Sequence, residues 1–313
     1  MKERPLTLLV AGPVRMTLDL PMGTFPASDG MHRTLELSLS PRPAGAGTEM
    51  ALAVSRQKGR ALLCASVGAD GMGAELHAFL RGEGVDTRHL VAHKGGATPL
   101  TVRFSEEGES VRDATYLGVG NDPDGESLAE AMTCLPDGCL LSAELSPAIL
   151  HRTASFCHDR RIPCLVDGVG ADPAALKGLA PLFAVALGAE ECGRLTGIAP
   201  FGVEEAMTAA LSLSRLIPAS YHLLWLADKG SYLYDGKLAR FFPACGSQKS
   251  LSCAASAYAA TFLLTHLRGV DPRAACRAAS VASALASRRE ADLSSLPTLE
   301  ELVRAIKSPS YTI

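Results

Sequence analysis

Short apolar runs that alternate with longer amphipathic stretches are the feature that most constrains the fold of this chain. The apolar runs predict strands at 6–11, 61–65, 138–142, 163–167, 182–187 and 223–227. The amphipathic stretches predict helices at 51–57, 72–81, 147–160, 173–177 and 204–216. Strands that are apolar along nearly their whole length need cover on both faces, and the intervening helices supply it. We therefore expect an α/β fold with a parallel sheet between two helical layers.

Two stretches depart from this rhythm. Residues 35–39 and 100–104 alternate apolar and polar side chains, which is typical of a sheet with one solvated face. They predict a small β-sheet beside the main one, whose apolar face needs a cover of ligand, core or another subunit. Residues 299–307 predict a short helix near the end of the chain.

The composition argues against several classes of function. The 313 residues carry a net charge of −3, which gives no electrostatic case for binding nucleic acid or an anionic membrane. The longest uncharged run, 250–267, is too polar to span a membrane. Nine cysteines without a C-x-x-C pair indicate reduced thiols in a cytoplasmic protein, and nothing in the cysteines and histidines suggests a metal site. The apolar run that ends before Arg15 fits a buried first strand better than a signal peptide.

Several short motifs follow one another along the chain. Residues 67–73 read V-G-A-D-G-M-G and residues 80–87 read L-R-G-E-G-V-D-T. Together with 97–99, 107–109, 190–197, 229–230 and 234–236, these segments resemble the ribokinase-like (PfkB) sugar kinases. The resemblance implies one ribokinase-like domain over 1–313, a parallel αβα sandwich with a small β-sheet lid. The lid strands would come from about 14–42 and 97–118 and would exclude water from phosphoryl transfer.

Residues 250–264 resemble the family's D-T-x-G-A-G-D-A-F signature, with departures at the reacting positions. Ser256 stands where the family has its catalytic Asp, and a serine hydroxyl is no proton acceptor near neutral pH. Cys253, Ala254 and Ala255 replace the Gly-Ala-Gly whose amides form the anion hole. A β-carbon at Cys253 or Ala255 is expected to obstruct both a positive φ and a close approach to phosphate.

Other departures fall on the substrate and nucleotide positions that the resemblance implies. The family's early substrate Asp falls at Thr17, with Asp19 as a possible stand-in, and its G-G-x-x-x-N motif falls on 44–49 without an Asn. The substrate-binding candidates are Asp19, Gly45, Gly47 and Glu49. The nucleotide-binding candidates are Gly188, Glu191, Trp225, Ala227 and Gly230.

For several of these residues a purely structural role competes with a functional one. Ser256, or Ser252, is more simply an N-cap hydroxyl for the helix that runs to Leu267. Glu191 is implied to orient magnesium-bound water, or is a surface carboxylate. Trp225, in the middle of its predicted strand, either fills the nucleotide space or packs in the core. Asp70 is expected to cap the helix that includes Met72.

Two functions remain open from the sequence. The favoured one is a carbohydrate-kinase homologue with impaired or lost ATP-dependent phosphotransfer, a pseudokinase that binds a sugar-like ligand or a partner. The alternative is an active kinase that phosphorylates a hydroxymethyl group with a non-standard site. The resemblance implies ATP and Mg as cofactors, although the departures predict weak or absent ATP binding, and it implies a homodimer formed through the lid. No protein metal site is predicted.

Overall fold

Strand β1 (Thr7–Ala11) lies inside the main sheet and has no polar face. Leu8 and Val10 belong to one hydrophobic core, whereas Leu9 and Ala11 belong to a second core on the other side. Successive side chains of a strand point to opposite faces, so the apolar run after Thr7 requires two cores. A computed structural model describes residues 4–21, 40–106, 109–245, 253–287 and 293–308.

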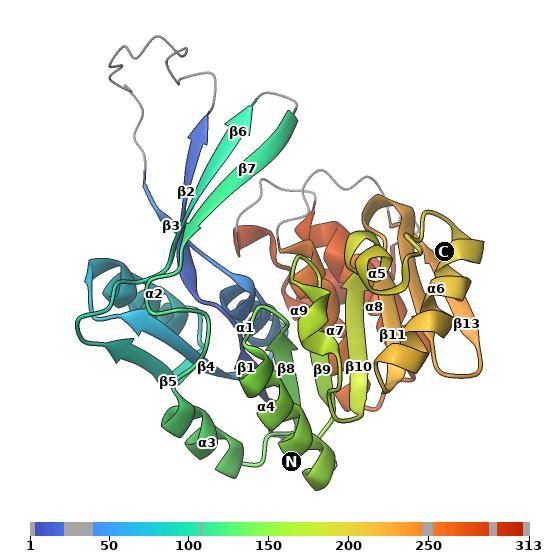
Figure 1. The fold of residues 1–313 in the computed structure, drawn as a ribbon, viewed down its shortest axis with the longest axis horizontal. Coiled ribbons are helices and arrows are strands. Elements are labelled where there is room, and N and C mark those ends of the chain that lie inside the picture. The colour runs from blue at the N-terminus through green and yellow to red at the C-terminus, as the bar shows by residue number, and fades with distance from the viewer. Residues whose placement is uncertain (1–3, 22–39, 107–108, 246–252, 288–292, 309–313) are drawn as a thin grey trace.

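The large sheet holds nine strands within the described residues, in the order β13-β12-β11-β10-β9-β8-β1-β4-β5 (Figure 1). Neighbours pair in parallel from β11 to β5, and β12 and β13 are antiparallel. Besides β1, these strands are β4 (Arg60–Gly68), β5 (Asp86–His93), β8 (Gly138–Ser142), β9 (Cys164–Asp167), β10 (Leu182–Gly188), β11 (Ala219–Trp225), β12 (Gly230–Tyr234) and β13 (Ala239–Pro243).

Helices cover both faces of this sheet, as the apolar strands predict. One core includes α1 (Ala46–Arg56), α2 (Gly71–Gly82), α7 (Ala254–Leu267) and α8 (Pro272–Ala286). The other includes α3 (Gly125–Thr133), α4 (Pro147–Arg160), α5 (Ala189–Thr196) and α6 (Val203–Leu216). Helix α9 (Leu299–Ile306) packs against α8. The helix predicted at 173–177 is a single 3₁₀ turn, Pro173–Leu176, capped by Asp172.

A separate small sheet has the order β3-β2-β6-β7, and β2, β6 and β7 project from the body of the molecule in Figure 1. Its strands are β2 (Arg15–Pro21), β3 (Arg42–Ala44), β6 (Leu100–Glu106) and β7 (Glu109–Tyr116). The strand predicted at 100–104 lies within β6, whereas the one predicted at 35–39 lies outside the described residues. The expected fold, a parallel αβα sandwich with a small β-sheet, is confirmed.

The position of Trp225 within its strand differs from the one expected from the sequence. Trp225 was expected in mid-strand, but β11 begins at Ala219 and ends at Trp225 because the chain turns at Ala227, where φ is 50°.

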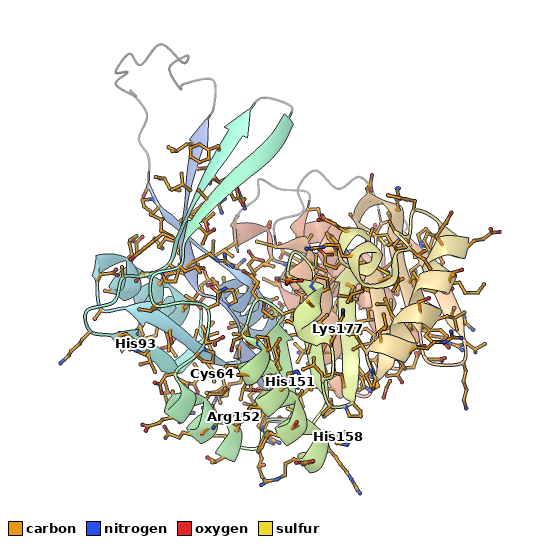
Figure 2. All side chains as sticks on the ribbon, in the orientation of Figure 1. Cys64, His93, His151, Arg152, His158 and Lys177 are labelled. Carbon is orange, nitrogen blue, oxygen red and sulfur yellow. The ribbon has the colours of Figure 1, made fainter. Side chains whose placement is uncertain are left out.

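No helix within the described residues is long and apolar enough to cross a bilayer. Figure 2 shows His151 and His158 on α4, on the side of the molecule away from the projecting small sheet.

Asp70 joins the small sheet to the main body. As the N-cap of α2 it accepts the N–H of Gly73 at 2.8 Å, and it also accepts both the N–H and the hydroxyl of Thr98, at 2.8 and 2.6 Å. Thr98 is fully buried just before β6, and its hydroxyl oxygen accepts the N–H of Gly68. Burial opposes the charge on Asp70, but these hydrogen bonds outweigh it and hold its pKa below the ordinary value.

We expect Asp70→Ala to lower the free energy of unfolding by about 2–4 kcal/mol, since a helix cap and the partners of buried Thr98 are lost together. Asp124→Ala, which removes only the cap of α3, serves as the matched control and should cost about 1 kcal/mol. Because the Asp70 pKa is lowered in the folded state, its contribution is present above about pH 4 and is lost as the pH falls through that pKa. Urea unfolding at several pH values measures both effects; equal losses for the two variants would contradict this role.

Candidate active site

A cleft of about 640 Å³ lies where the small sheet faces the carboxyl edge of the large sheet. Asp167, Gly188 and Trp225 line it, and each is the last residue of its strand, β9, β10 and β11. Ligands of open α/β sheets bind at this edge, where the strand order changes direction. Here the change occurs at β1, which pairs with β4 on one side and with β8 on the other. The cleft therefore occupies the expected binding position of the fold.

Helix α1 begins at the wall of this cleft because two glycines permit a close backbone contact. A Cβ at Gly47 would lie 2.4 Å from the carbonyl oxygen of Gly12, and Gly47 donates its N–H to Pro13 at 3.0 Å. Gly45, the N-cap, has φ 98°, which favours glycine. This packing places Gly45 and Glu49 on the cleft wall, whereas Gly47 is buried behind it.

Helix α7 also begins at the cleft, and its N-cap residue has a positive φ that the sequence was expected to prevent. Cys253 is the N-cap and has φ 64°, a left-handed conformation that costs a non-glycine residue roughly 1–3 kcal/mol. The expectation that a β-carbon here prevents a positive φ is therefore wrong. Cys253, Ala255 and Ser256 line the cleft, while Ala254 is buried. The free amides of a helix N-terminus attract anions, so phosphate remains a suitable ligand here.

Ser256 does not cap this helix, which corrects the structural role favoured from the sequence. It lies in the third position of α7 and donates its hydroxyl to Oε2 of Glu49 at 3.0 Å. The contact joins α7 to α1 across 207 positions of sequence. Ser252, the other possible cap, lies outside the described residues.

Two carboxylates of the cleft have raised pKa values, Asp167, which is buried, and Glu49, which is half-buried. Burial raises the pKa of Glu49, and the hydrogen bond from Ser256 offsets only part of that effect. Burial also raises the pKa of Asp167 to about 7, with neighbouring Glu49 and Glu144 adding to the rise and the N–H of Val169 opposing it. Among the described residues neither Glu49 nor Asp167 forms an ion pair within 4.0 Å.

The small sheet presents a polar face to the cleft. Arg15 pairs with Glu144, and Arg103 of β6 pairs with Asp113 of β7 at 3.2 Å. Beside them the hydroxyls of Thr101 and Thr115 are hydrogen bonded at 3.0 Å, and Thr17 also lines the cleft. Sequence reasoning missed these cations and carboxylates because each lies outside a recognisable motif. Only the alternation of polar and apolar residues in 100–104 gave a signal, since it places Thr101 and Arg103 on one face.

Trp225 dominates the end of the cleft that the resemblance assigns to nucleotide. Its side chain is 6% exposed, and its indole Nε1 donates to the hydroxyl of Ser283 on α8 at 2.9 Å. Beneath it a second cavity of about 10 Å³, lined also by Ala227 and Gly230, has room for one water at most. Trp225 therefore belongs both to the core and to the cleft wall. Lys229 lies nearby with its ammonium 4.7 Å from the ring centre of Phe201.

Glu191 is 4% exposed, so the interpretation as a surface carboxylate is wrong. It accepts the N–H of Gly188 at 3.1 Å and that of Gly170 at 3.0 Å, which fixes the start of α5. Both carboxylate oxygens thus have protein donors. No group of three histidine, cysteine, aspartate or glutamate side chains within the described chain can hold a metal ion. These residues do not fit a metal site of the protein's own; magnesium would have to arrive with nucleotide phosphates.

Most candidates chosen from the sequence meet at the cleft, but some do not reach it. Asp19 does not line it and instead pairs with Arg42 at 2.8 Å. The candidates that line the cleft are Gly45, Glu49, Gly188, Glu191, Trp225, Ala227, Cys253, Ala255 and Ser256. Gly230 borders only the small cavity below Trp225. The cleft thus combines a helix N-terminus suited to phosphate with polar groups suited to hydroxyls.

Comparison with solved structures shows the same fold in three ribokinases. The one from Arabidopsis thaliana, complexed with ribose and ATP, has a TM-score of 0.83 at 17% identity, over 97% of this chain and 99% of its own. The one from Cryptococcus neoformans var. grubii, in complex with ADP, has 0.80 at 20%, over 96% and 99%. The one from Giardia lamblia has 0.79 at 17%, over 96% and 98%.

Comparison of sequences gives a family. No curated protein matches the chain. The profile of the pfkB family carbohydrate kinases matches residues 28–299, which is most of the 313 residues. The large sheet with its small second sheet agrees with that match, since the ribokinases share this fold. The chain belongs to the pfkB family of carbohydrate kinases.

Proposed function

We propose that this chain binds a small sugar-like molecule in the cleft and transfers phosphate from ATP to one of its hydroxyls, with impaired use of the nucleotide. The acceptor half supports the first part of this proposal. Threonine hydroxyls and arginine side chains of the small sheet face buried carboxylates across the cleft, and such groups bind polyols. Two of the ribokinases of the same fold were solved with ligands, one with ribose and ATP and the other with ADP.

The position of Trp225 is the observation that carries the second part. Its indole ring lies at the nucleotide end of the cleft and is held by packing and by its hydrogen bond to Ser283. To admit a purine base beside β11, this ring has to move, and its contacts and the hydrogen bond to Ser283 would be lost. The phosphate side retains support, because the N-terminus of α7 and Lys229 lie at the same cleft.

We expect magnesium-ATP to bind this chain more weakly than a low micromolar dissociation constant, and Trp225→Thr to tighten binding at least fivefold. The smaller side chain opens space next to the 10 Å³ cavity. Trp225→Phe is the matched control: it keeps most of the bulk and loses the hydrogen bond, so it should gain much less. Isothermal titration calorimetry measures all three proteins.

A low micromolar dissociation constant for the unaltered chain would contradict impaired nucleotide use. If sugars raise the melting temperature and no nucleotide binds, the result instead favours complete loss of phosphotransfer, the pseudokinase alternative. A ligand present at 100 times its dissociation constant stabilises the fold by about 2.7 kcal/mol, so either kind of ligand is detectable in this way.

We expect Ser256→Asp alone to give no gain in sugar phosphorylation, although it restores the residue type of the family. The new carboxylate would replace the hydroxyl that donates to Glu49, and two carboxylates at hydrogen-bond distance cannot both be ionised without strong repulsion. Release of ADP in a coupled assay with D-ribose measures the rate. A rate ten times that of the unaltered chain would refute the argument.

We also propose that the chain forms a homodimer through its small sheet. Thr101 and Arg103 face the cleft, so Val102 between them lies on the opposite face of β6, where Tyr116 of the neighbouring strand is 62% exposed. Light scattering should report twice the chain mass, and Val102→Glu should halve it. Leu238→Glu, at an exposed position between β12 and β13, is the control and should leave the dimer intact. A monomer for the unaltered chain would refute this proposal.

A further inference from the structure

Glu49 and Ser256 are two departures from the family pattern that meet in space. Glu49 occupies the last position of the G-G-x-x-x-N motif, where a neutral amide is replaced by a carboxylate. Ser256 occupies the position of the family's Asp, where a carboxylate is replaced by a hydroxyl. The two side chains are joined by a hydrogen bond of 3.0 Å, and both line the cleft. The site has therefore kept one carboxylate at this point, carried by α1 rather than by α7.

The surroundings of Glu49 suit a group that takes up a proton. The nearest arginines are engaged elsewhere, Arg15 with Glu144 and Arg103 with Asp113, so within the described chain no cation pairs with Glu49. Its neighbours of like charge are Glu144 and Asp167, and Asp167 is buried at the end of β9. Burial without a paired cation raises the pKa of Glu49, which makes it a stronger base than an exposed glutamate.

Resting on the proposed function, we propose that Glu49 is the catalytic base of this chain and accepts the proton of the acceptor hydroxyl, while Ser256 is a positioning residue that holds it. The hydroxyl oxygen of the sugar forms a bond to the γ-phosphorus of ATP as the bond from that phosphorus to the β,γ-bridging oxygen breaks. ADP leaves with the electron pair of the broken bond. The proton of the hydroxyl passes to Glu49, which returns it to water after product release.

A merely structural role is the rival explanation of this contact. A serine that donates to a glutamate between two helix N-termini could serve only to fasten α7 to α1. Asp167 is a rival base, because it lines the same cleft and its pKa lies near 7. The two rivals predict different results for the variants. If the contact only fastens the helices, its removal lowers stability; if Asp167 is the base, the loss of rate appears when Asp167 is replaced.

The test compares Glu49→Gln with the unaltered full-length chain. Glutamine keeps the size of the side chain and can still accept the Ser256 hydroxyl, so the variant is expected to fold. We expect the rate of phosphate transfer from millimolar magnesium-ATP to D-ribose, D-fructose, adenosine or water to fall by about 10²–10⁴-fold. The calorimetric dissociation constant of magnesium-ADP should stay within twofold, which a general loss of structure would not allow.

Further variants separate the base from its neighbours. Glu49→Asp retains a carboxylate and should keep part of the activity, whereas Ser256→Ala should lose less than tenfold. Glu49→Asn combined with Ser256→Asp moves the carboxylate back to α7 and should recover activity relative to Glu49→Gln. Asp167→Asn provides the comparison with the rival base, and melting temperatures of all variants report on folding.

Each outcome decides between the inference and its alternatives. The role of Glu49 is overturned if Glu49→Gln lowers the rate of phosphate transfer less than threefold, or if only Asp167→Asn lowers it strongly. Either result leaves the proposed function intact. A loss of rate in Glu49→Gln accompanied by an equal loss of magnesium-ADP binding also overturns the role of Glu49. Absence of transfer to every acceptor by the unaltered chain overturns the proposed function itself, and the base with it.

Discussion

The close contact between the backbone at Gly12 and the start of α1 determines the geometry of the site. A Cβ at Gly47 would lie 2.4 Å from the Gly12 carbonyl oxygen, so only glycine lets α1 begin this near the end of β1. From that starting point Glu49 reaches the cleft and meets the first turn of α7. The carboxylate of Glu49 is thus positioned by the packing of backbone against backbone at the start of α1, and not by other charged side chains.

The charges of the cleft are arranged so that Arg15 and Arg103 do not pair with Glu49 or Asp167. Arg15 and Arg103 are paired with Glu144 and Asp113, which leaves Glu49 and Asp167 with hydrogen bonds and with pKa values that burial raises. An arginine bridge to either carboxylate would lower its pKa and would block the cleft for a neutral polyol. These two ion pairs therefore leave Glu49 and Asp167 accessible from the cleft and without an arginine that would lower their pKa.

The fold could be predicted from the sequence because burial on both faces leaves strands such as 182–187 without polar residues, and Asp70 follows the chemistry of helix caps. The candidate site was predicted only in part. The hydrogen bond between Ser256 and Glu49 joins residues 207 positions apart, and no local pattern encodes such a contact. The positive φ of Cys253 also escaped prediction, because tertiary packing can impose a conformation that a residue disfavours by itself.

The position of Trp225 gives this protein a built-in optical reporter. It is the single tryptophan of the chain, so all indole emission arises from one place at the cleft wall. The ring is 6% exposed and its N–H is bonded to a serine on α8, so its emission maximum reports the polarity of this end of the cleft alone. A molecule that enters at that end changes the spectrum directly, whereas one that fills only the side of the small sheet leaves the indole environment as it is. Fluorescence can therefore distinguish occupancy of the two halves of the cleft without any added label.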